Sequence, residues 1–289
     1  MNGSATTAEP LIRIIHPSDF SKASMLAFAH ALKLALLSKA ELEIVHVQAH
    51  QPGSVQDVHW SDFPGVRATL ARWNLISLDA KIEDVEKTGL RAKKILNSAK
   101  DPLESMVQYC EEHPPDLLVL ATHQREGLNR WLHKPVAEPL ARRSRAMTLF
   151  VPEHGPGFIS PANGAVNLHR VLIPVDHEPV AQSAIEEAFF LAEGLGCQNV
   201  EFKLLHVGTE KGMPTLFLPH HPDYKWQDRL TNGDPVEVIL REAALWSADL
   251  LVFTTQGHRD FFDAWRGSTS ERVLRGAHCP VLAVPAKES

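Results

Sequence analysis

Apolar residues occur along the chain in short unbroken runs that alternate with longer stretches of helical periodicity. The runs at residues 11–15 (LIRII) and 170–175 (RVLIPV) are mostly aliphatic, which indicates strands buried on both faces. Residues 21–37 and 182–195 carry Ala and Leu at helical spacing, and Ser21 is a suitable N-cap. This alternation predicts a parallel sheet with helices on both faces.

The pattern occurs twice. LIRIIHPSD, which ends at Asp19, recurs as LHRVLIPVD, which ends at Asp176, and DLLVLAT at 116–122 recurs as DLLVFTT at 249–255. Asp-Pro pairs at 101–102 and 234–235 each precede a helical pattern, where proline fits the first turn. We therefore divide the chain into two domains, a first half and a second half, at residues 1–153 and 167–289.

Two connections separate these repeated segments. Residues 153–166 (EHGPGFISPANGAV) contain three glycines and two prolines, which predicts a flexible linker between the halves. Residues 48–91 of the first half are irregular, and we expect a long connection there with one helix. The second half replaces it with a shorter segment that is too rich in proline for a long helix.

Composition excludes several classes of protein. A net charge of -6 argues against general nucleic-acid binding. The three cysteines, Cys110, Cys197 and Cys279, are far apart, which disfavours disulfides and structural zinc and favours a cytoplasmic location. We expect no secretory signal, because the first residues lack a basic segment followed by a long apolar run, and no membrane span, because no apolar run of 18 residues occurs. The 16 histidines lack the spacing of a metal site.

With these features, each half resembles a universal stress protein domain. The resemblance is carried by HPSDFS at 16–21 and IPVDHE at 173–178, by the His-Val pairs at 46–47 and 206–207, and by the Asp-Pro and DLLV segments. It implies an α/β fold of two tandem doubly wound domains. Each would be a five-stranded parallel sheet of order 3-2-1-4-5 with helices on both faces. It also implies that some members bind ATP.

The ATP-binding members carry Gly, two residues, Gly, nine residues and then Gly-Ser or Gly-Thr. The second half has Thr254 in place of the first glycine, then Gly257, nine residues, and Gly267-Ser268. Glycines allow backbone N–H groups to converge on a phosphate, and a helix N-terminus favours anions. The alternative is that Ser268 and Glu271 form only a helix-capping box. In the first half the matching positions hold Ala121, Gln124, Lys134 and Pro135.

The resemblance implies a nucleotide site in the second half alone. Asp176 would contact adenine or ribose, and Val207 would offer its backbone to adenine. The alternatives are a turn residue for Asp176 and ordinary core packing for Val207. His258 and Arg259 could neutralise phosphate or could be solvated loop residues. The expected nucleotide-binding residues are Pro174, Val175, Asp176, Val207, Thr254, Gly257, His258, Arg259, Gly267, Ser268 and Thr269.

The chain is accordingly predicted to be a cytoplasmic stress-response regulatory protein that binds ATP, ADP or AMP in its second half. Mg²⁺ is expected only together with ATP, and no catalytic or metal-ligating residue is assigned. One alternative is a stress-associated interaction module that binds no nucleotide, which Thr254 favours. The other is a slow adenine-nucleotide hydrolase. An unidentified protein partner is expected, with no nucleic acid and no membrane.

The last strand of each half is short and apolar. These strands are MTLFVP at 147–152 and PVLAVP at 280–285. The resemblance implies that single-domain members pair through their last strands, and exposed edges of this kind favour pairing. We predict that they pair antiparallel within one chain, as an intramolecular pseudo-dimer, with the nucleotide site facing away from that seam. The alternative is two independent domains. In addition, two such tandem chains could form a homodimer.

Overall fold

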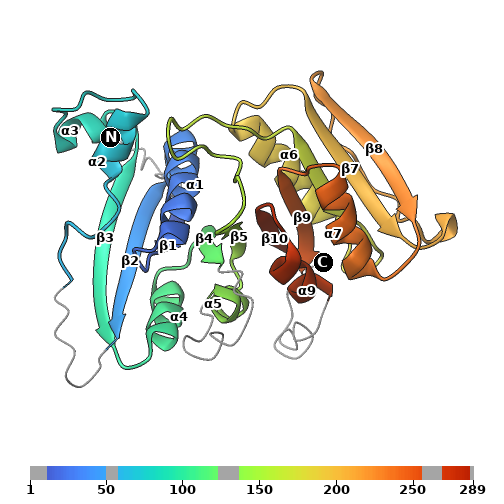
Figure 1. Ribbon diagram of the computed structural model, residues 1–289, viewed down its shortest axis with the longest axis horizontal. Helices are drawn as coiled ribbons and strands as arrows, with labels where there is room; N and C mark the ends of the chain where they lie inside the picture. Colours follow the sequence, from blue (N-terminus) through green and yellow to red (C-terminus); the bar gives the residue numbers. More distant parts are fainter. Residues whose placement is uncertain (1–11, 50–57, 123–136, 256–268, 287–289) are drawn as a thin grey trace, which may run out of the picture.

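The computed structural model describes residues 12–49, 58–122, 137–255 and 269–286. A ten-stranded sheet runs through these residues in the order β3-β2-β1-β4-β5-β10-β9-β6-β7-β8 (Figure 1). The first half provides β1 (Arg13–Pro17), β2 (Glu41–Ala49), β3 (Arg91–Ala99), β4 (Leu117–Thr122) and β5 (Met147–Pro152). The second half provides β6 (Arg170–Pro174), β7 (Val200–Val207), β8 (Tyr224–Thr231), β9 (Leu250–Thr255) and β10 (Val281–Pro285). Within each half the strands are parallel in the predicted order 3-2-1-4-5.

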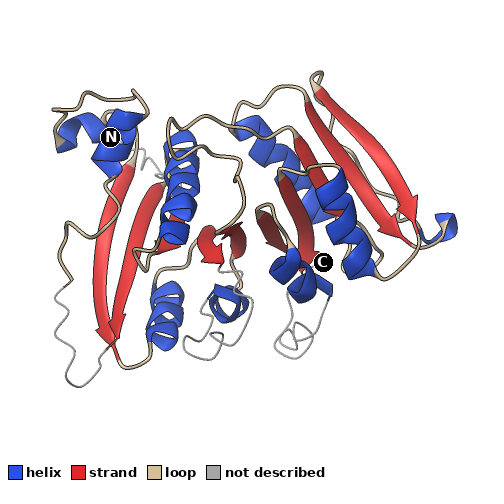
Figure 2. Cartoon of the chain, viewed as in Figure 1, coloured by secondary structure: helices blue, strands red, loops and turns tan. Residues whose placement is uncertain are grey.

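Helices cover both faces of the sheet, as predicted (Figure 2). One face carries α1 (Lys22–Ser38), α2 (Val66–Arg72) and α6 (Gln182–Gly194). The other carries α4 (Pro102–Glu112), α5 (Ala137–Ser144), α7 (Pro235–Leu245) and α9 (Thr269–Gly276). A 3-10 turn, η2 (Glu210–Gly212), follows β7. The expectation of one helix in the 48–91 connection is wrong, because both α2 and the five-residue α3 (Ile82–Glu86) lie there.

Helix starts follow the sequence signals. The Ser21 hydroxyl accepts a hydrogen bond from the N–H of Ser24 at 3.1 Å and caps α1. Asp101 and Asp234 cap α4 and α7 in the same way, each followed by a proline in the first turn. These bonds satisfy N–H groups that have no partner inside the helix.

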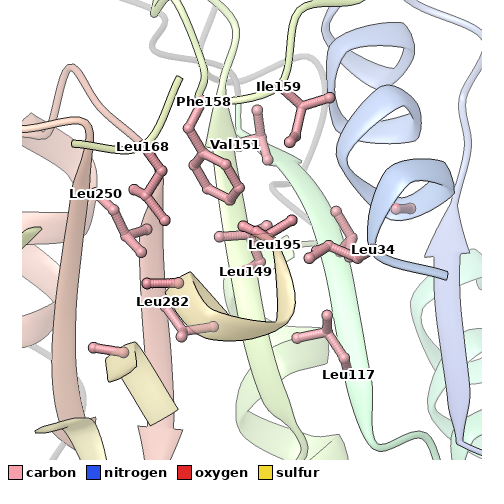
Figure 3. Packing of buried hydrophobic residues seen from close by; sticks show 14 of the residues in the cluster. Leu34, Leu117, Leu149, Val151, Phe158, Ile159, Leu168, Leu195, Leu250 and Leu282 are labelled. Atoms are coloured by element: carbon pink, nitrogen blue, oxygen red, sulfur yellow. The ribbon is translucent and has the colours of Figure 1, made fainter. Parts of the chain in front are cut away.

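The two halves meet through the last strand of each. β5 pairs antiparallel with β10, with Val281 opposite Phe150, Leu282 opposite Leu149 and Ala283 opposite Thr148. The predicted pairing within one chain is therefore confirmed. Residues of both halves share one hydrophobic cluster at this seam, where Leu149 and Val151 lie near Leu282 and Phe158 (Figure 3).

The linker is not flexible as its composition suggested, because residues 153–166 pack against the first half. Phe158 and Ile159 are fully buried in the shared cluster. Their backbone N–H groups both donate to Nε2 of His30 in α1, at 3.1 and 3.2 Å. A second contact comes from Trp73, whose indole N–H donates to the carbonyl of Pro161 at 3.2 Å. Two buried apolar side chains and the hydrogen bonds to His30 and Trp73 fix the conformation of this segment.

The geometry around His30 defines its protonation state. Its Nδ1 donates to the carbonyl of Leu26 at 2.9 Å, so Nε2 is left as an unprotonated acceptor for the two linker N–H groups. Gly157 has a φ of +62°, and a Cβ there would lie 2.5 Å from Cε1 of His30. Only glycine combines that backbone conformation with such close approach.

Removing the buried linker ring should destabilise the whole protein. Phe158→Ala is expected to lower the free energy of unfolding by about 3–5 kcal/mol, because it leaves a cavity in a packed core. Urea denaturation followed by circular dichroism measures this change. Phe217→Ala is the matched control: Phe217 is 73% exposed, so its loss should cost within about 0.5 kcal/mol. Equal small effects from both variants would show that the linker does not contribute to the core.

Acid should weaken the fold through two histidines. Burial lowers the pKa of His16 and of His30 from 6.5 to about 4, so both are neutral when folded. The unfolded chain binds these protons more readily, so their stabilisation is complete above pH 6.5 and is lost as the pH falls toward 4. Each histidine should cost about 2 kcal/mol by about pH 5. Urea titrations across this range should show a smaller pH dependence for His30→Gln; an unchanged slope would contradict the assignment.

Candidate functional site

The residues predicted to hold the base and ribose lie at the carboxyl ends of neighbouring strands. β6 lies between β7 and β9 in the sheet. Pro174, Val175 and Asp176 end or follow β6, and Val207 ends β7. The structure thus brings these four residues to one edge of the second half. The carboxyl ends of strands in open parallel sheets are where ligands usually bind.

A histidine ties the ends of β6 and β7 together. Nδ1 of His206 donates to the carbonyl of Val175 at 3.1 Å, and the Val175 N–H donates to the carbonyl of Leu205 at 2.9 Å. The first half repeats the arrangement, since Nδ1 of His46 donates to the carbonyl of Ser18 at 2.7 Å. The repeated His-Val pairs therefore have a structural reason: the histidine fixes the turn that follows the first strand of each half.

The chain after β7 wraps closely over this imidazole. A Cβ on Gly208 would lie 2.6 Å from Nε2 of His206, and one on Gly212 would lie 3.0 Å from it. The Gly208 N–H donates to the carbonyl of Thr231 and so extends the ladder between β7 and β8. Glycine at position 208 is therefore required for the backbone to pass the ring.

The two residues assigned to the nucleoside differ in exposure. Asp176 is exposed, and its Oδ1 accepts a hydrogen bond from the N–H of His177 at 2.8 Å. Val207 is half-buried, paired with Thr231 and packed against the core. Asp176 is thus a turn residue with a carboxylate at the surface, which is compatible with either of its two interpretations.

Thr254 has a structural use of its own. It is buried in β9, and its hydroxyl accepts a hydrogen bond from the N–H of Ala184 at 3.3 Å. Ala184 lies in the first turn of α6, whose N-cap residue Ala181 makes no side-chain capping bond. Thr254 supplies the hydrogen-bond acceptor that Ala181 lacks, so its side chain points at the first turn of α6.

The phosphate part of the predicted site falls mostly outside the described residues. Gly257, His258, Arg259, Gly267 and Ser268 are all in that segment. Thr269, which follows it, is exposed and begins α9. The prediction that the site faces away from the seam concerns the same segment. However, α9 itself reaches across the seam, because Arg275 hydrogen-bonds to Glu138 of the first half.

Comparison with known proteins agrees with this architecture. The family model described as "Universal stress protein family" matches residues 12–152 and 215–285. The chain belongs to the universal stress protein family. Universal stress protein MJ0531 of Methanocaldococcus jannaschii is 28% identical over 150 residues, which cover 44% of this chain and 88% of the relative.

Two solved structures share the tandem fold over nearly the whole length. A universal stress protein from Archaeoglobus fulgidus DSM 4304 has a TM-score of 0.59 at 16% identity, covering 96% of this chain and 97% of that one. The functionally unknown protein PA1789 of Pseudomonas aeruginosa PAO1 has a TM-score of 0.58 at 11% identity, covering 96% and 93%. At these identities the likeness concerns the fold alone.

In the first half of this universal stress protein, the matching edge of the sheet is filled by its own aromatic rings. Phe20, which follows Asp19, has a φ of +63°, a rare conformation for a bulky residue. Its ring stacks on His46 at 4.2 Å between centroids and meets Phe63 edge-on at 5.2 Å. Trp60 stacks in turn on Phe63. The second half has the exposed His177 at the position of Phe20.

Sequence reasoning missed the histidines of the His-Val pairs. The His-Val pairs carry the family resemblance, and the expected role falls on Val207 rather than on His206. The signal was present, because a histidine recurs at the same place in both halves. Among the residues that the structure describes, no three His, Cys, Asp or Glu side chains gather as a metal site, and no helix is long and apolar enough to cross a bilayer.

The capping role of Thr254 can be measured directly. Thr254→Val keeps the shape but removes the acceptor, and should lower the free energy of unfolding by about 1–2 kcal/mol. Ser21→Ala, which removes the ordinary cap of α1, is the reference and should cost about 1 kcal/mol. Thermal or urea denaturation of both variants provides the test. A Thr254→Val protein as stable as the wild type would mean that this hydroxyl is not needed by α6.

Proposed function

We propose that this universal stress protein is a cytoplasmic regulatory protein that binds ATP, or the related ADP or AMP, in its second half. The observation that carries the proposal is the asymmetry between the halves. In the first half, Phe20 lies on His46 at the strand ends, and Pro135 replaces the hydroxyl residue of the glycine pattern. The second half has the exposed His177 in place of Phe20 and keeps Gly257 and Gly267-Ser268.

The base and ribose would lie over the carboxyl ends of β6 and β7. Pro174 and Val175 would form the floor, the exposed carboxylate of Asp176 would accept from ribose or adenine, and Val207 would offer its backbone. His206 supports this arrangement because its Nδ1 donates to the carbonyl of Val175 and so fixes the backbone at the end of β6. A planar base would then take the place that an aromatic ring holds in the first half.

The phosphates would lie toward the start of α9. Backbone N–H groups of Gly257, Gly267, Ser268 and Thr269 would converge on them, with the positive end of the helix dipole behind. His258 and Arg259 would supply counter-charge. Thr254, at the position of the first glycine, does not oppose this proposal, because its hydroxyl is directed at α6.

The proposal includes no chemical step. Burial raises the pKa of Cys110 and Cys279 to about 12 and that of Cys197 to about 11, which makes all three poor nucleophiles. Mg²⁺ would be bound through the phosphates of ATP. Occupancy of the second half would change a surface that a protein partner reads.

The test is a calorimetric titration of the full chain with ATP and with AMP. We expect one nucleotide per chain at saturation. Gly267→Val should weaken ATP binding by about 1–3 kcal/mol, because a branched side chain blocks the approach of phosphate to backbone N–H groups. Circular dichroism should show an unchanged fold.

Lys134→Val is the matched control, since Lys134 holds the same place in the first half. It should leave ATP affinity unaltered. Two equivalent sites, or equal losses from both variants, would contradict the assignment to the second half. Wild-type protein that binds neither nucleotide would favour an interaction module without a ligand.

A further inference from the structure

Phe217 combines an exposed aromatic ring with a backbone that is held firmly. It is 73% exposed, yet its N–H donates to Oε1 of Gln182 at 3.0 Å and its carbonyl accepts from Nε2 of the same side chain at 3.1 Å. Its neighbours Leu216 and Leu218 pack against the core. The backbone at Phe217 is therefore fixed, so only a few rotamers decide where its ring lies.

The contact with Gln182 places Phe217 next to the strand ends of the second half. Gln182 is the first residue of α6, which begins after the turn that carries Asp176. A β-bridge between Asp176 and Val180 closes this turn, and the Val180 side chain is exposed. Two exposed apolar side chains, Val180 and Phe217, therefore flank the start of α6 beside the carboxylate that is assigned to the nucleoside.

The matching connection of the first half supplies aromatic rings to the same edge of the sheet. Phe217 lies between β7 and β8, and Trp60 and Phe63 lie between β2 and β3. In the first half, Phe63 meets the ring of Phe20 edge-on at 5.2 Å, and Trp60 stacks on Phe63. The second half has His177 at the position of Phe20. It therefore lacks the phenyl ring that this connection meets in the first half.

We propose that Phe217 contacts the base of the nucleotide bound by the second half, with Val180 beside it. This inference rests on the proposed function and concerns the base rather than the phosphates. A purine would supply the planar partner that Phe20 supplies in the first half. Because Gln182 already fixes the backbone of Phe217, little conformational freedom remains to be lost when the base binds.

The experiment titrates adenosine and ATP into full-length Phe217→Ala and Phe190→Ala proteins by calorimetry. Phe190 is the matched control, because it is also exposed, at 57%, but lies about 12 Å further along α6 than Gln182. We expect Phe217→Ala to weaken adenosine and ATP by the same factor, about tenfold, as is usual when a ring that stacks on a base is removed. Phe190→Ala should change neither affinity, and circular dichroism should show that both variants keep the fold.

A tryptophan at the same position gives a direct readout of the contact. Phe217→Trp keeps a planar ring, so it should retain adenosine affinity, and its additional tryptophan emission should fall as adenosine binds. Phe190→Trp should show no such fall. Emission from Phe217→Trp that does not respond to adenosine bound in the calorimeter would contradict a contact between this side chain and the base.

The outcomes separate the contact from the nucleotide site itself. Wild-type protein that binds adenosine and ATP, with both affinities unchanged in Phe217→Ala, would overturn the role of Phe217 alone. A loss confined to ATP would also overturn it, since a contact with the base must affect both ligands. Wild-type protein that binds neither ligand would overturn the proposed site together with this contact.

Discussion

The antiparallel pairing of β5 with β10 is the interaction on which the rest of the molecule depends. It involves only three residue pairs, yet it converts two apolar edges into interior strands of one sheet. The edges that remain are β3 and β8, and both carry exposed charged residues, such as Lys93 and Arg229. Charged edge strands resist further pairing. The central pairing therefore removes two apolar edges from the surface, and the charged outer strands disfavour pairing with further copies of the chain.

The two halves share this architecture but differ at matching buried positions, where one half has polar residues and the other apolar ones, or where the two carry opposite charges. The buried His16 and Ser24 of the first half form a hydrogen-bonded network, whereas Ile173 and Ala181 hold these places in the second. On the opposite face of the sheet, Glu43 accepts a hydrogen bond from the hydroxyl of Tyr109. Lys203, which matches Glu43 in the second half, lies over the Trp246 ring. At these positions each copy pairs its buried polar groups within its own half.

Much of the fold follows from features that are local in sequence. The apolar runs predicted the strands and the Asp-Pro pairs predicted two helix starts, whereas the order of the strands came from the resemblance to universal stress protein domains. The seam was also predictable, because the family resemblance implies pairing through the last strand and an apolar last strand occurs in both copies. The contact of His30 with Phe158 was not predictable, since it joins residues 128 positions apart through tertiary packing.

Only those residues of the candidate site that belong to a sequence motif were predictable. Asp176 and Val207 do lie at one edge of the second half. The positive φ of Phe20 and the hydrogen bond from Ala184 to Thr254 were not predictable, because both depend on packing between the sheet and its neighbouring segments. The pair of Glu138 and Arg275 likewise depends on how two halves dock, which no local pattern encodes.

The docked linker also decides where the chain could be divided. Composition places the boundary at Glu153, but Phe158, Ile159 and Pro161 are bound by side chains of the first half. A fragment that ended at Glu153 would expose an apolar slot and leave the imidazole of His30 without its two donors. The packed first half therefore extends at least to the end of the linker, and a gene fusion or split-protein reporter that respects the fold should be cut after that point.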